Sequence, residues 1–104
     1  MFMRDEKLAK RIAQLFLNEK LIGFKIKSVC SKYDGFGAYK FWILSDNFKD
    51  KTRFESISIV TDILFAHVPQ KDRVKVWALS THTDEDEMHA HVMQWNGAKY
   101  LPEL

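Results

Sequence analysis

The fold is decided by one stretch in the middle of the chain, Asp34-Gly35-Phe36-Gly37-Ala38-Tyr39-Lys40-Phe41-Trp42-Ile43-Leu44. Its first four residues favour a tight turn, because glycine reaches backbone conformations that other residues avoid and aspartate hydrogen-bonds to its own backbone. The apolar run after the turn predicts a strand that is largely buried on both faces. We therefore expect a β-hairpin in which this run forms the second strand.

A helix and a strand are predicted before this run. Apolar residues recur at helical spacing over residues 5–20, with Asp5 at the N-cap position and polar side chains on the opposite face. Gly23 is expected to end this helix. Residues 24–27 then alternate apolar and basic side chains, which predicts a half-buried strand as the first arm of the hairpin.

The segment after the hairpin has two interpretations. Residues 45–53 are polar and predict a loop, whereas residues 54–68 are rich in apolar side chains. The β-branched residues of this second segment favour a strand, but its apolar spacing is helical and its length exceeds that of a usual strand. We expect a helix that stops at Pro69.

The last third of the chain predicts one more strand and one more helix. Residues 73–80 have the composition of a strand, and Thr83 is the expected N-cap of the helix that follows. The first turn of this helix, residues 84–87, is acidic, as the helix dipole favours. Asn96-Gly97 is expected to end the helix and leave a tail over residues 97–104. The predicted apolar stripe of this helix is Met88, Val92 and Trp95.

These elements follow the order α-β-β-α-β-α and predict an α+β fold. We expect two layers, a three-stranded sheet with all helices on one face. A chain of 104 residues has room for one domain, residues 1–104. The content of 46% hydrophobic and 29% charged residues is typical of a globular chain and excludes a disordered one.

The composition also limits the compartment. Cys30 is the single cysteine, which excludes a disulfide or a cysteine-only metal site within the chain. The apolar runs are too short to span a membrane, and the first residues lack the apolar stretch of a signal peptide. We therefore expect a cytoplasmic protein with no membrane partner.

The formal net charge of +2 hides an uneven distribution. Residues 1–53 carry 12 of the 16 basic residues and 6 acidic ones, whereas residues 54–104 carry 4 basic and 8 acidic residues. Half of the acidic residues in the second part lie in the helix start at residues 84–87, where the dipole explains them without catalysis. A partner is therefore to be sought first on the basic half.

Basic side chains are the candidate nucleic-acid-binding residues. Cations of this kind position phosphates, and the aromatic residues Tyr33, Phe36 and Tyr39 are available for base stacking. A solvated helix face and an edge strand protected by lysines explain the same pattern equally well. The first group comprises Lys7, Lys10, Arg11, Lys25 and Lys27, and the second comprises Lys49, Lys51 and Arg53.

Catalysis and metal binding have less support. The sequence contains no Gly-rich phosphate loop, no G-x-S-x-G and no H-E-x-x-H motif, so we expect a protein that is not an enzyme. His89 and His91 flank the acidic run, but residues two apart on a helix diverge. Cys30 and His82 are the weak candidates for metal binding, and we expect no metal and no cofactor.

Large aromatic residues support a second hypothesis, a protein–protein interaction module. The three tryptophans and the tail supply more apolar surface than a three-stranded sheet and three helices cover. The candidate partner-binding residues are Trp77, Trp95 and Tyr100. A module of this kind acts as an inhibitor or an adaptor, or forms a homodimer through a strand edge.

Residues 39–83 resemble the BolA family. The family pattern is an aromatic-Lys strand running into Ser-Asp-x-Phe, a polar loop, a helix, a strand that ends in Ala-Leu and a Thr-bearing helix cap. The matching residues here are Tyr39-Lys40, Ser45-Asp46-Asn47-Phe48, Ala78-Leu79 and Thr81-His82-Thr83. The resemblance implies a fold like that of the second class of KH domains, and a regulatory role that includes nucleic-acid binding.

Three positions depart from the family pattern. BolA-like proteins hold an iron–sulfur cluster, together with a monothiol glutaredoxin, through a His in the strand Val-His-Ala-Leu. This chain has Trp77 at that position, and tryptophan does not ligate iron. The family's Arg-His pair falls near Ile57-Ser58, and its loop ligand corresponds only to Cys30. The resemblance therefore extends to the fold and not to the cluster.

The leading hypothesis from the sequence is a small non-enzymatic binding or regulatory protein that acts through nucleic acid or a protein partner. One alternative is an inhibitor or adaptor module with no nucleic-acid role, which includes a homodimer. A second alternative is an iron–sulfur, glutaredoxin-linked protein that uses Cys30 and His82.

Overall fold

The structure is a computed structural model that describes residues 5–95 and 97–101. It is an α+β fold, and the predicted class is confirmed. Its elements are α1 (Glu6–Leu17), α2 (Glu19–Ile22), β1 (Ser28–Tyr33), β2 (Tyr39–Leu44), the 3-10 helix η1 (Asp46–Phe48), α3 (Arg53–His67), α4 (Gln70–Arg73), β3 (Val76–His82), α5 (Glu85–Met93) and β4 (Lys99–Leu101).

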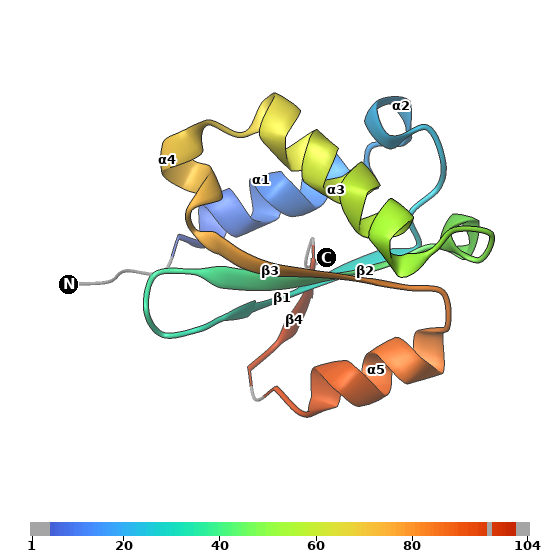
Figure 1. The fold of residues 1–104 in the computed structure, drawn as a ribbon. Coiled ribbons are helices and arrows are strands. Elements are labelled where there is room, and N and C mark those ends of the chain that lie inside the picture. Colours follow the sequence, from blue (N-terminus) through green and yellow to red (C-terminus); the bar gives the residue numbers. More distant parts are fainter. Residues whose placement is uncertain (1–4, 96, 102–104) are drawn as a thin grey trace.

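The strands form one mixed sheet in the order β3-β2-β1-β4 (Figure 1). β1 and β2 are the antiparallel hairpin, β4 joins β1 antiparallel, and β3 lies parallel to β2 after a crossover through α3 and α4. The predicted count of three strands is wrong. The segment Lys99–Leu101, expected as a tail, pairs with Val29–Ser31 and supplies the fourth strand.

Helices cover both faces of the sheet, so the predicted two-layer arrangement with all helices on one face is wrong. Figure 1 shows α1 and α3 on one side and α5 on the other. The buried strand β2 explains the difference, because Phe41 and Ile43 belong to the core under α1 and α3, whereas Trp42 and Leu44 belong to the core under α5. A strand that is apolar on both faces needs cover on both.

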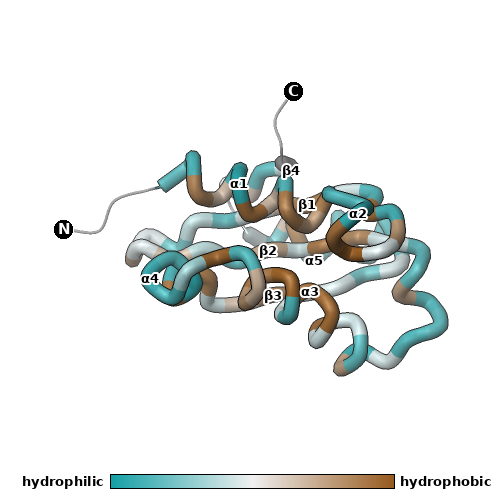
Figure 2. The backbone as a smooth tube through the Cα atoms, turned by 90° about the horizontal axis from the view of Figure 1, so that it is seen from above, coloured by the Kyte–Doolittle hydropathy of each residue, from teal (hydrophilic) through white to brown (hydrophobic). Residues whose placement is uncertain are grey.

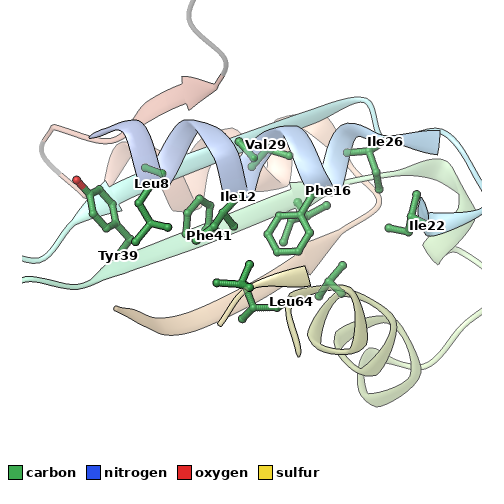
Figure 3. Packing of buried hydrophobic residues seen from close by; sticks show 14 of the residues in the cluster. Leu8, Ile12, Phe16, Ile22, Ile26, Val29, Tyr39, Phe41 and Leu64 are labelled. Carbon is green, nitrogen blue, oxygen red and sulfur yellow. The ribbon is translucent and has the colours of Figure 1, made fainter. Parts of the chain in front are cut away.

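The larger core lies between the sheet, α1 and α3. Leu8, Ile12 and Phe16 of α1 point toward the sheet, where the ring of Phe16 meets the ring of Phe41 edge-on at 6.0 Å (Figure 3). Leu64 reaches the same cluster from α3. In Figure 2, α1 alternates between brown and teal segments, as expected for a helix with one apolar side.

The predicted helix over residues 5–20 is interrupted. Asp5 caps α1 as expected, and its side chain accepts from the amide of Leu8 at 3.0 Å. α1 ends at Leu17, because Asn18 leaves the helical conformation and its side chain caps α2 by accepting from the amide of Lys20. Gly23 ends α2 at φ +90°, a conformation that favours glycine.

The predicted strand over residues 24–27 is wrong, since β1 begins at Ser28. The turn after Tyr33 sets the pairing, and Ser28 already lies opposite Leu44, the last residue of β2. Residues 24–27 therefore lie beyond the end of β2. Lys25 and Lys27 belong to the loop between α2 and β1.

The helix predicted over residues 54–68 is confirmed as α3. Thr52 and Glu55 cap it reciprocally, because the Thr52 side chain accepts from the Glu55 amide and the Glu55 side chain accepts from the Thr52 amide. The strand predicted over residues 73–80 is shifted to β3, since the short helix α4 occupies residues 70–73.

The start of the last helix also differs from the prediction. Asp84 caps α5, with its side chain accepting from the amide of Glu87 at 3.0 Å, so the expected cap at Thr83 is wrong. Met88 and Val92 are buried as predicted. Asn96, predicted in the turn that ends the helix, lies outside the described residues.

Candidate functional site

The outer edge of β3 is the first feature of the candidate site. β3 is hydrogen-bonded to β2 on one side, and among residues 5–95 and 97–101 no strand pairs with its other side. The amide of Ser45 donates to the carbonyl of His82 at 3.0 Å. Alternation along the strand therefore turns the backbone groups of Leu79 and Thr81 away from β2, with Leu79 partly exposed and Thr81 buried.

A groove of about 490 Å³ borders this edge on the side of α3. Residues of α3 and α4 form one wall and residues of β3 form the other. The volume lies in the range of ligand-binding clefts. The apolar lining residues are Ile57, Leu64, Phe65, Val74, Val76, Trp77, Ala78 and Leu79.

Three large apolar side chains beside the groove are exposed. Phe65 is 61% exposed, Val74 70% and Trp77 50%. Val60 and Leu64 fill the buried face of α3, which leaves Phe65 outside the core. The Trp77 ring lies on the α5 side of the strand, 6.0 Å from the ring of Trp95. An extended segment added to β3 therefore finds apolar neighbours on both faces of the sheet.

Arg73 is the charged residue of the groove lining. Its guanidinium lies 4.4 Å from the centre of the Phe65 ring and donates to the Phe65 carbonyl at 3.4 Å. The neighbouring Asp72 pairs with Arg11 at 3.3 Å instead. Among the described residues no carboxylate pairs with Arg73, so its other N–H donors face the groove and solvent.

A cluster of three tryptophans surrounds Lys40 on the α5 side of the sheet. The Lys40 ammonium lies 5.0 Å from the ring centre of Trp42, 5.1 Å from that of Trp95 and 5.9 Å from that of Trp77. Cation–π attraction of this kind stabilises the cluster. It also fixes the Trp77 ring beside the open edge.

A small polar cavity of about 150 Å³ lies at the other end of β3, lined by Arg53, Ser56, Thr81, His82 and Glu87 among others. The hydroxyls of Ser56 and Thr81 share a buried hydrogen bond of 2.7 Å. The imidazole of His82 is hydrogen-bonded to Ser80 through Nε2, while Nδ1 lies 3.8 Å from the Glu87 carboxylate. Burial lowers the pKa of His82, and the neighbouring His91 lowers it further.

Five of the eight predicted nucleic-acid-binding residues come together at one end of the molecule. Lys25 and Lys27, in the loop before β1, lie beside the segment of Lys49, Lys51 and Arg53. The contact between the two segments is direct, because the Ser45 hydroxyl donates to the Lys25 carbonyl at 2.6 Å and Asp46 pairs with both Lys27 and Lys49. The residues Lys7, Lys10 and Arg11 lie apart from them, on α1.

Carboxylates neutralise much of this basic end. Asp46 lies 3.1 Å from the Lys27 ammonium and 3.5 Å from that of Lys49, and the hydrogen bond from Lys27 lowers the pKa of its carboxyl group. Lys51 pairs with Asp50 at 3.2 Å. The cations therefore alternate with anions along this surface, which weakens its attraction for a polyanion.

The two weak metal candidates are both buried. Cys30 lies in β1 with no exposed surface, and burial raises the pKa of its thiol to about 12, so the thiol stays protonated at neutral pH. Among the described residues no group of three His, Cys, Asp or Glu side chains is arranged to hold a metal ion. The structure gives Cys30 and His82 no common site of that kind.

The three predicted partner-binding residues are divided between the two edges of the sheet. Trp77 lies at the β3 edge and Trp95 packs between Trp42 and Trp77. Tyr100 lies on β4 at the opposite edge, 42% exposed, with its hydroxyl 3.3 Å from His89 Nδ1. These residues therefore do not form one surface.

Sequence reasoning did not find Phe65, Arg73 or Lys40. The run Ile63-Leu64-Phe65 could have indicated an exposed apolar side chain, because three adjacent apolar residues on a helix cannot all face one core. Arg73 was assigned to a strand, and its place beside Phe65 depends on the turn through α4.

Among the described residues, no helix is both long and apolar enough to cross a membrane. Comparison with known proteins gives no match, since no family model fits the chain and neither a curated protein nor a solved structure is similar to it.

Proposed function

We propose that this protein is a non-enzymatic interaction module that binds an extended segment of a partner protein along the open edge of β3. The observation that carries the proposal is the coincidence of an apolar groove with an edge strand whose outer side no strand of the described residues pairs. The backbone of β3 supplies hydrogen bonds to the added strand, and the groove receives its alternate side chains.

The size of the edge supports this mode of binding. β3 runs over seven residues, Val76–His82, which at about 3.3 Å per residue extends for roughly 20 Å. Exposed edges of this length favour association unless charges, prolines or a covering segment protect them. The exposed large hydrophobic side chains here are Phe65, Val74 and Trp77, which favour apolar contact.

The first experiment captures partners from a lysate of the source organism with and without nuclease. The test variant is Phe65→Ser combined with Val74→Ser, because both side chains are more than half exposed and their loss leaves the core intact. The matched control is Phe36→Ser, which removes a ring that is 74% exposed on the hairpin turn, outside the groove. We expect the double variant to lose the partner and the control to keep it, with nuclease having no effect.

The second experiment places the purified partner on the structure. Hydrogen exchange of the outward amides of Leu79 and Thr81 slows when a strand is added, whereas the amides of β4 are unchanged. Protection of β4 alone, or capture that the double variant does not weaken, contradicts the proposal.

A second candidate function is nucleic-acid binding, which the gathering of Lys25, Lys27, Lys49, Lys51 and Arg53 supports. The BolA/KH-like assignment proposed from residues 39–83 favours the same role. Phosphate contacts weaken steeply with salt, so the apparent affinity for a short single strand should fall several-fold between 50 mM and 200 mM salt. Lys25→Glu combined with Lys49→Glu should abolish it. Binding that salt does not affect excludes this role.

A further inference from the structure

The chemistry of the groove restricts which segment fits the β3 edge. We propose, resting on the function proposed above, that the bound segment carries a carboxylate side chain, Asp or Glu, which pairs with Arg73 while its neighbouring apolar residues fill the groove. The occupant is a segment of a separate protein.

The first argument is the state of the Arg73 guanidinium. It stacks on the exposed ring of Phe65 at 4.4 Å and makes one hydrogen bond, to the Phe65 carbonyl. Stacking and that bond hold the planar group in place, so little entropy is lost when a carboxylate binds its remaining donors. Arginine offers those donors in a fork that matches the two oxygens of a carboxylate.

The second argument is the distribution of charge around the groove. Arg73 is the charged side chain of its lining, and the nearest acidic residue along the chain, Asp72, is held by Arg11 at 3.3 Å. The arginine is therefore not neutralised by a carboxylate of the described chain. An apolar segment without an acid would cover this cation and remove water from it without compensation.

The third argument concerns the competing occupants. A second copy of this chain would have to pair β3 with β3 antiparallel, because a twofold axis reverses the strand. That pairing brings Arg73 of one copy toward the end of β3 in the other copy, where Arg53 lines the polar cavity. The lining of that cavity carries two cations, Lys51 and Arg53, and one carboxylate, Glu87, so a homodimer offers Arg73 less negative charge than an acidic partner does.

The experiment selects eight-residue segments from a random peptide library displayed on phage, with the whole chain as bait. Parallel selections use Arg73→Glu, Arg73→Gln and the control Lys10→Glu, which makes the same charge change at an exposed position on α1. Thermal unfolding and amide spectra verify that each variant is folded.

We expect the wild-type chain and Lys10→Glu to enrich Asp or Glu among β-branched and aromatic residues. Arg73→Glu should enrich Lys or Arg instead, and Arg73→Gln should show no charge preference. A selected acidic peptide should bind Arg73→Glu about tenfold or more weakly than it binds the wild type. It should also slow exchange at Leu79 and Thr81.

Two outcomes separate this inference from the proposed function. Peptides that protect Leu79 and Thr81 but show no acidic preference, or none that Arg73→Glu reverses, overturn the inference and leave the function standing. Absence of any enriched peptide that Phe65→Ser weakens overturns both. A stable dimer in light scattering that Phe65→Ser dissociates identifies a second copy as the occupant and overturns the proposal of a separate partner.

Discussion

The two edges of the sheet differ in length and in what surrounds them. β4 has three residues, and its Lys99 pairs with Glu6 at 3.6 Å while its Tyr100 contacts His89. β3 has seven residues, an apolar groove on one side and a half-exposed tryptophan on the other. A short strand with charged and polar contacts is a protected edge, whereas the longer β3 edge lies beside apolar side chains, which is the basis of the proposed strand addition. This difference between the two edges is the reason that we propose a partner at β3 and not at β4.

The largest predicted effect tests whether the two edges depend on the same core. Trp42 is buried, and its ring packs against Trp95, which precedes β4. Trp42→Ala should lower the free energy of unfolding by about 3–5 kcal/mol, because it leaves a large cavity under α5. Denaturant unfolding measures the loss, and hydrogen exchange should show β4 opening before β3. Equal opening of both strands would remove the distinction between the edges.

The next largest effect on stability is expected from the buried hydrogen bond that joins β3 to α3. Thr81→Val removes the buried hydrogen bond to Ser56, whose hydroxyl still contacts the carbonyls of Thr52 and Arg53. The cost should be about 1 kcal/mol in unfolding free energy. Thr83→Val, which changes the next threonine along the chain, serves as the control and should cost less. A larger loss in the control would mean that the Ser56–Thr81 bond does not hold the edge.

The free energy of unfolding is expected to depend on pH through His82, at the end of β3. Burial lowers the pKa of His82 in the folded chain, so the unfolded chain binds a proton first as pH falls. The stability from neutral His82 is complete above its unfolded pKa, about 6.5, and is lost as pH falls through the folded pKa. Unfolding curves from pH 8 to pH 5 measure it. His82→Gln should flatten the profile, and an unchanged profile would contradict the assignment.

The smallest effect is predicted at the other edge. Lys99→Ala removes an exposed ion pair with Glu6 and should change the unfolding free energy by about 0.3 kcal/mol. Capture of a partner should be unaffected. A clear loss of partner binding with this variant would transfer the interaction to β4 and reverse the comparison.

Much of the fold was predictable because local signals agreed. The turn over residues 34–37, the buried strand after it and the helix α3 were predicted where they occur, since turn chemistry and apolar spacing act over a few residues. The strand predicted over residues 24–27 failed for a longer-range reason. Its pairing depends on where β2 ends, and the alternation of apolar and basic residues does not report that.

The candidate site was less predictable than the fold. Asp46 and Asp50 lie close to Lys49 and Lys51 in the sequence, so those two ion pairs are local, whereas the ion pair of Asp46 with Lys27 joins residues far apart in the chain. Trp77 was predicted to bind a partner, which stays a prediction, and its side chain is 50% exposed. Arg73 and Phe65 meet only because α4 turns the chain back onto α3.

The sequence by itself determined the α+β class, the turn and the buried strand over residues 34–44, and the long helix that follows them, because periodicity and turn residues restrict the backbone locally. The tertiary structure alone decided that α5 covers the second face, that Lys99–Leu101 becomes a strand and that β3 is left at the edge. Those features depend on which elements compete for the two faces and two edges of one sheet. That competition is settled by packing between residues far apart in the chain.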